Sequence, residues 1–114
     1  MNLQATAREA GGVLVVELSG RIVLGDDSAF LRKMIRSLLD EGRTRIVLNL
    51  GDVDYIDSAG IGELVSGFCA VRSRGGELKL LSLNRRVRDL LQLTKLYTVF
   101  DVHTEEAMAL RSFR

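Results

Sequence analysis

The sequence predicts an α/β fold, in which a mixed, mostly parallel sheet of about five strands has an N-terminal hairpin and about four helices. Short runs rich in Val, Ile and Leu alternate with longer stretches of helical apolar spacing, which is the pattern of right-handed βαβ units. A Gly-Gly pair between the first two strand-like runs indicates the hairpin turn. With 114 residues and no linker or repeat, the chain is expected to form one domain over residues 1–114.

Strands are predicted where short apolar runs are rich in β-branched residues or alternate with polar ones. The run at 45–50 is almost continuously apolar, as expected for a parallel strand that helices cover, and the polar stretch 51–56 after it is expected to be a loop. The strands predicted in chain order are residues 3–7, 13–18, 45–50, 77–81 and 98–102.

Helices are predicted where apolar residues recur at helical spacing after a capping residue. Asp26 and Asp27 are suited to cap the first helix, and Gly42 to end it in the left-handed conformation. Asn84 and Thr104 can cap the third and fourth helices. The apolar stripes lie within residues 30–39, 61–69, 87–91 and 108–110.

The composition is that of an ordinary globular domain, with 46% hydrophobic and 27% charged residues and a net charge of +1. A charge balance near zero argues against direct nucleic-acid binding, so the basic cluster at 85–88 is expected to be a solvated helix face. No apolar run reaches the roughly 20 residues of a membrane span, and the first residues lack signal-peptide features. A cytoplasmic protein without membrane insertion is expected, with the single Cys69 buried and inert.

Residues 54–62, Asp-Tyr-Ile-Asp-Ser-Ala-Gly-Ile-Gly, lie where a buried strand and its loop lead into a helix. Open α/β sheets usually place their sites at this carboxyl edge. Ser58 would stand beside the unpaired N–H groups and the partial positive charge of the helix start, where a phosphate is tolerated. Gly60 and Gly62 each cost a helix about 1 kcal/mol relative to alanine. Small residues here are therefore expected to leave the backbone open to close approach by another protein.

Residues 57–62, Asp-Ser-Ala-Gly-Ile-Gly, resemble the D-S-[SA]-G-[LI]-G signature of anti-sigma-factor antagonists, which are STAS-domain proteins. The resemblance extends through the strands at 13–18 and 46–50 and the segments at 76–80, 84–87 and 93–96. It implies that Ser58 is phosphorylated by an anti-sigma factor that is itself an ATP-dependent serine kinase, and dephosphorylated by a PP2C-type phosphatase. The unphosphorylated protein would sequester the kinase and free a sigma factor, whereas the phosphorylated protein would let the kinase go.

The same resemblance implies a partner-binding surface around Ser58. Family members commonly carry an acidic residue three places after the glycine that follows the second strand, but this chain has Val23 there, after Gly20. Asp26 is a candidate for the same role, and a weak homodimer is left open. No cofactor is expected, since any nucleotide would belong to the partner kinase. The expected partner-binding residues are Leu24, Asp26, Asp57, Ser58, Ala59, Gly60, Ile61 and Gly62.

An alternative within the family is a STAS docking subunit of a phospholipid-transport ABC complex or a stressosome. An exposed apolar surface near Leu24 and Ile61, with no phosphate on Ser58, would favour that alternative.

An enzyme is not expected. A serine hydrolase needs a G-x-S-x-G turn, but Ile56 stands at the place of the first glycine, and the single histidine, His103, is expected in a surface turn. Asp52 and Asp54 fit turns better than a metal site, because a hard cation needs six or more oxygen ligands. Outside its motif, Ser58 would be interpreted as an ordinary helix cap, and Asp57 competes with it for that position.

Overall fold

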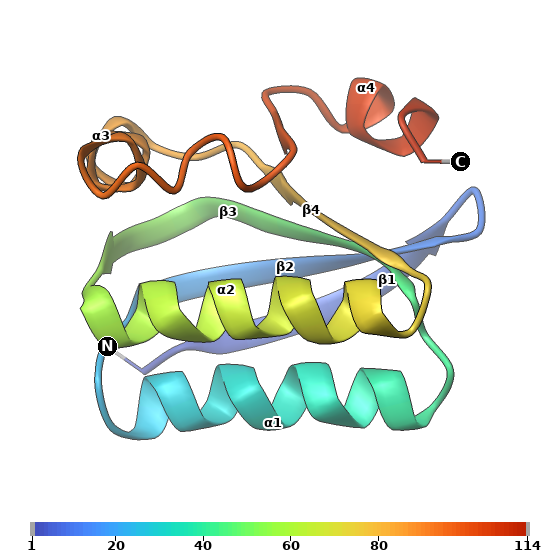
Figure 1. The fold of residues 1–114 in the computed structure, drawn as a ribbon, viewed down its shortest axis with the longest axis horizontal. Helices are drawn as coiled ribbons and strands as arrows, with labels where there is room; N and C mark the ends of the chain where they lie inside the picture. Colours follow the sequence, from blue (N-terminus) through green and yellow to red (C-terminus); the bar gives the residue numbers. More distant parts are fainter. Residues whose placement is uncertain (1, 114) are drawn as a thin grey trace.

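The computed structural model describes residues 2–113, which form a five-stranded mixed sheet with helices on both sides (Figure 1). The strand order is β1-β2-β3-β4-β5, with β1 antiparallel to β2 and every other neighbouring pair parallel. The predicted fold class is therefore confirmed. The elements in chain order are β1 (Gln4–Ala10), β2 (Val13–Ile22), α1 (Asp26–Asp40), β3 (Arg45–Ile56), α2 (Ser58–Ser73), β4 (Glu77–Leu81), α3 (Arg85–Leu93), β5 (Val102–His103) and α4 (Glu106–Arg111).

The turns that shape the first half follow from its glycines. Gly11 and Gly12 have φ angles of 59° and 80°, so they form the left-handed turn of the predicted hairpin. Gly42 follows α1 with a φ of 81°, as predicted for a left-handed helix end. These positions favour glycine because a side chain destabilises positive φ angles.

The predicted caps of α1 were wrong. Gly25 occupies the N-cap position, and its backbone N–H donates to the Ser28 hydroxyl at 3.2 Å. Asp27 is buried and accepts a hydrogen bond from the backbone N–H of Leu3 at 3.0 Å. Its carboxylate therefore fixes the start of the chain against α1 instead of capping the helix.

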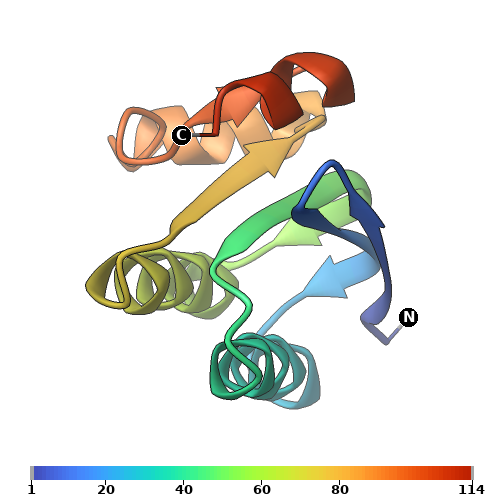
Figure 2. The same cartoon turned by 90° about the vertical axis from the view of Figure 1, so that its right-hand side faces the viewer.

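The sheet divides the interior into two clusters of apolar side chains. α1 and α2 lie side by side and pack into the main cluster, to which Leu31, Leu48 and Leu64 belong (Figures 1 and 2). A smaller cluster, which includes Val47 of β3 and Ala109 of α4, lies on the other side. Successive β3 residues thus enter different clusters, as the alternation of side chains along a strand requires.

β3 continues to Ile56, so the prediction of a loop at 51–56 was wrong. The second half of β3 pairs in parallel with the second half of β2, and Ile22 lies opposite Ile56. Two register shifts interrupt the pairing between Glu17 and Arg21. Val53 and Ile56 are buried, and their burial favours an extended chain despite the turn-like Gly and Asp residues around them.

β5 is a strand of two residues, so the strand predicted at 98–102 was wrong in extent and position. Phe100 turns into the core instead and packs edge to face against Phe68, with ring centroids 5.4 Å apart. Burial of the Phe100 ring thus stabilises this bent segment.

Two further predictions need correction. Thr104 does not cap α4, because the N-cap residue is Glu105, which makes no side-chain hydrogen bond there. Cys69 is exposed, since α2 turns Leu64 and Val71 toward the core and Cys69 away from it. Across residues 2–113, each helix falls short of the length and apolar character that a membrane crossing needs.

Candidate functional site

Ser58 is the first residue of α2 and is exposed to solvent. The residue before it, Asp57, donates its backbone N–H to the carbonyl of Ile22 at 3.2 Å, which continues the pairing of β2 with β3 up to the start of the helix. Within residues 2–113, the Ser58 hydroxyl makes no hydrogen bond, so it is available at the surface.

Asp57 is the residue that caps α2. One carboxylate oxygen accepts from the backbone N–H of Gly60 at 2.9 Å, and the other accepts from the backbone N–H of Leu24 at 2.9 Å. Desolvation raises the pKa of this carboxyl group, but the backbone N–H donors, that of Leu24 foremost, outweigh it and hold the pKa below its ordinary value of 3.8. Of the two candidates for the cap, the structure therefore selects Asp57 and leaves the Ser58 hydroxyl unused.

The two glycines of the motif have different reasons to be glycine. Gly60 is buried, and a Cβ built on it would lie 2.3 Å from the carbonyl oxygen of Ile22 and 2.6 Å from Cγ1 of Ile56. Gly62 is exposed, and a Cβ there would meet nothing within 4 Å. The prediction that both glycines leave the backbone open to a partner therefore holds for Gly62 alone. Gly60 is glycine because it packs closely against β2 and β3.

The surface around Ser58 is partly apolar. Leu24 is 78% exposed in the loop before α1, and the hydrogen bond from its backbone to Asp57 holds that loop beside the start of α2. Asp26, the first residue of α1, is exposed, whereas Ile61 is buried. An exposed apolar surface near Ser58 therefore involves Leu24 without Ile61.

A shallow groove of about 550 Å³ opens beside Ser58, between the end of β3 and α3. Tyr55 contributes from β3 with 43% of its surface exposed, and Leu93 contributes from the last residue of α3 with 81% exposed. Sequence reasoning missed this groove, because nothing local in the sequence of α3 places that helix beside residues 55–58.

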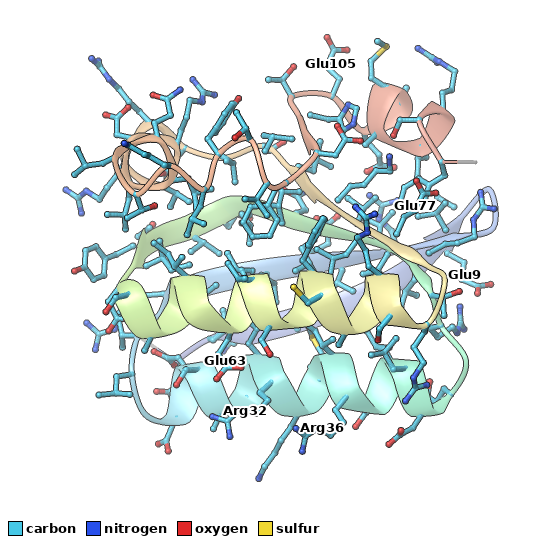
Figure 3. All side chains as sticks on the ribbon, in the orientation of Figure 1. Glu9, Arg32, Arg36, Glu63, Glu77 and Glu105 are labelled. Atoms are coloured by element: carbon cyan, nitrogen blue, oxygen red, sulfur yellow. The ribbon has the colours of Figure 1, made fainter. Side chains whose placement is uncertain are left out.

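The start of α2 is also joined to α1. Arg32 of α1 and Glu63 of α2 point toward one another (Figure 3), and Nε of the arginine lies 3.1 Å from a carboxylate oxygen of the glutamate. An exposed pair of this kind adds little stability, about 0 to 1 kcal/mol. It does, however, help to set the position of the helix that carries Ser58.

Other side chains that the sequence suggested for chemistry lie in ordinary structural settings. Within residues 2–113, no three His, Cys, Asp or Glu side chains are placed to hold a metal ion. Asp52 and Asp54 are exposed residues of β3. His103, expected in a turn, instead lies in β5, where Nε2 is 3.1 Å from a carboxylate oxygen of Asp101.

The STAS domain family matches residues 4–109. The chain is therefore a STAS-domain protein. The anti-sigma F factor antagonist of Paenibacillus polymyxa is 30% identical to it over 115 residues, which cover 96% of this chain and 94% of the relative. Within the STAS family, the chain thus belongs to the anti-sigma-factor antagonists.

Solved structures have the same STAS fold. A crystal structure of an anti-sigma factor antagonist from Mycobacterium paratuberculosis superposes with a TM-score of 0.84 at 20% identity, covering 99% of this chain and 95% of the other. A structure of the Bacillus cell fate determinant SpoIIAA in the phosphorylated form gives a TM-score of 0.72 at 19% identity, covering 95% and 97%. At these identities, the likeness shows the fold alone.

Proposed function

We propose that this STAS-domain protein is an anti-sigma-factor antagonist whose binding to an anti-sigma serine kinase is switched by phosphorylation of Ser58. The observation that carries the proposal is an exposed serine hydroxyl at the start of a helix that another residue, Asp57, already caps; among residues 2–113 this hydroxyl has no hydrogen-bond partner. A serine that was needed only as a cap would be bonded to the first helical turn.

The setting of Ser58 suits a reversible phosphate. The phosphate would stand at the N-terminus of a 16-residue helix, where the partial positive charge of the helix favours an anion even though the Asp57 carboxylate already accepts from the Gly60 N–H group. Phosphorylation adds about −1.5 to −2 charges and three acceptor oxygens at neutral pH. The fold can therefore accept the modification, while a partner that fits a neutral hydroxyl loses contact with it.

The partner surface that we propose is formed by the loop before α1 and the first turn of α2. Leu24 supplies an exposed apolar side chain, and a charge added to Ser58 beside it would have to be desolvated in the complex. Every 1.4 kcal/mol lost changes affinity about tenfold, so a coupling of a few kcal/mol is sufficient for a switch. The proposed surface comprises Leu24, Asp26, Ser58, Ala59 and Gly62, which Asp57, Gly60 and Ile61 support from beneath.

In this proposal the chain is a substrate and a binding partner, not an enzyme. Among residues 2–113, no base is hydrogen-bonded to the Ser58 hydroxyl: the Asp57 carboxylate accepts from the backbone N–H groups of Leu24 and Gly60, and the single histidine, in β5, lies beside Asp101. The kinase would supply ATP, a PP2C-type phosphatase would remove the phosphate, and all of these partners would meet in the cytoplasm.

The test is intact-mass analysis after incubation with ATP and each purified anti-sigma serine kinase from the same genome. We expect one added phosphate on the wild type and on Ser66→Ala, an exposed serine of the same helix, but none on Ser58→Ala. Ser58→Ala should bind the kinase persistently and Ser58→Asp more weakly. Equal kinase affinities for these two variants would refute the switch, and absence of phosphate with every kinase would favour a constitutive docking subunit.

A further inference from the structure

The groove beside Ser58, here called the Ser58 groove, has ionic groups on both walls. Ser58, Tyr55 and Asp57 line the side formed by β3 and α2, and Arg86 and Asp89 of α3 line the other. The other lining residues, Ile56, Leu90 and Leu93, are apolar, so the charged groups of the groove decide which ionic group it can accept.

The arginines of α3 look alike in the sequence but differ in the structure. Arg85 lies 3.9 Å from the Asp89 carboxylate, and Arg88 donates to the carbonyl of Leu83. Among residues 2–113, Arg86 makes no hydrogen bond or ion pair, and it faces the Ser58 groove. Of the three arginines in α3, it is therefore the one without a partner in the part of the chain that the structure describes.

The two carboxylates that line the groove, those of Asp57 and Asp89, form no ion pair with Arg86. The Asp57 carboxylate is turned toward the backbone and accepts hydrogen bonds from Leu24 and Gly60. Asp89 lies beside Arg85, one helical turn away on the same helix, which offsets its charge. An anion that entered the groove at Ser58 would thus find an unpaired guanidinium opposite.

We propose that phosphorylated Ser58 pairs with Arg86 across the Ser58 groove, so that the modified protein holds its own phosphate. This inference rests on the proposed function, because it concerns the phosphorylated state of the same serine. A guanidinium offers planar pairs of N–H donors that match two phosphate oxygens, and its long side chain can reach across an open groove.

The pair has a consequence for the switch. Once Arg86 is engaged, α3 and α2 are linked across the groove, and the apolar surface of Tyr55 and Leu93 between them becomes less accessible to a partner. The phosphate then acts twice, by adding charge beside Leu24 and by narrowing the groove on the other side of Ser58.

The experiment uses full-length protein with phosphoserine installed at position 58 during synthesis, so it needs no kinase. The midpoint of the second phosphate ionisation, about pH 6 for free phosphoserine, is followed by ³¹P NMR in the wild type, Arg86→Gln, Arg86→Lys and Arg85→Gln. Arg85→Gln is the matched control, because it removes the same charge from the neighbouring position of α3. Amide spectra of each protein establish that it is folded.

A pair with Arg86 stabilises the dianion, so the midpoint should be about half a pH unit higher in Arg86→Gln than in the wild type, as expected for an exposed ion pair. Arg86→Lys should retain part of the effect, and Arg85→Gln should leave the midpoint unchanged or slightly higher through Asp89. Equal midpoints in the wild type and Arg86→Gln, or equal shifts in Arg86→Gln and Arg85→Gln, would overturn the inference. Failure of the proposed function would appear separately, as absence of phosphate transfer by the kinases.

Discussion

Gly60 and Gly62 offer a controlled test of how the site is built, since both lie in the first turns of α2. Alanine stabilises a helix by about 1 kcal/mol relative to glycine, and this gain applies at both positions. At Gly60, the added methyl would lie 2.3 Å from the carbonyl oxygen of Ile22, an atom of the β2 backbone that cannot move aside without disturbing the sheet. Overpacking of this kind costs about 1 to 3 kcal/mol and occasionally more.

A contact of 2.3 Å with a backbone atom places the cost at the upper end of this range, about 3 kcal/mol, and the helix gain offsets about 1 kcal/mol of it. We therefore expect Gly60→Ala to lower the free energy of unfolding by about 2 kcal/mol. Gly62→Ala meets open space and should raise it by up to about 1 kcal/mol. For a domain of this size, these changes correspond to shifts in Tm of roughly −8 °C and +4 °C. Urea and thermal denaturation followed by circular dichroism would measure both.

The two variants together separate packing from helix propensity. If Gly60→Ala were as stable as the wild type, the close approach of α2 to β2 would be wrong. If Gly62→Ala were destabilised as much as Gly60→Ala, the packing around the two glycines could not be the cause of the loss of stability. Because Gly62 is part of the proposed partner surface, Gly62→Ala should also weaken kinase binding despite its greater stability.

Two further predictions concern ionic groups. The pKa of Asp57 is lowered, so its carboxylate contributes stability that is fully present above the unfolded-state pKa of about 3.9 and is lost as the pH falls through the folded pKa. The free energy of unfolding of Asp57→Asn, measured by urea denaturation, should therefore change less with pH below about 4 than that of the wild type. The same pH dependence in both proteins would contradict this. Lys79→Met removes a buried ammonium that donates to Asp101 at 2.7 Å and to the carbonyl of Ser112 at 3.3 Å. It should lower the free energy of unfolding by about 1 to 2 kcal/mol and speed amide exchange in α4, whereas unchanged exchange there would count against it.

The start of α2 could be predicted because its signals are local. A capping residue, a serine and an apolar stripe of helical spacing occur together in residues 57–69. The choice between Asp57 and Ser58 as the cap could not be predicted, since the second hydrogen bond of Asp57 comes from Leu24, 33 residues earlier in the chain. Asp57 is the cap because its carboxylate has one oxygen for the N–H of Gly60 and another for the N–H of Leu24.

Non-local packing also explains the errors. Gly60 appears in the sequence as a costly helix residue, but the structure requires glycine there because the carbonyl of Ile22 leaves no room for a Cβ, and Ile22 lies in β2, which pairs with β3. The same pairing makes 51–56 a strand in spite of its turn-like composition. Phe100, which lies in a run of good strand formers, leaves the sheet because its ring packs on Phe68. In each case, a tertiary contact overrides a local preference.

The contacts that hold the backbone around Ser58 constrain how a phosphate there can act. The backbone N–H of Asp57 is paired with β2, and the Asp57 carboxylate accepts a hydrogen bond from the loop of Leu24. Gly60 allows the first helical turn to pack closely against Ile22. A phosphate would have to break several of these contacts to move the main chain, whereas it can repel or attract neighbouring side chains without breaking any. The two states of such a switch differ in surface charge and in side-chain contacts rather than in the path of the main chain. The enzymes that add and remove the phosphate, and not a slow rearrangement of the fold, would therefore set the rate of switching.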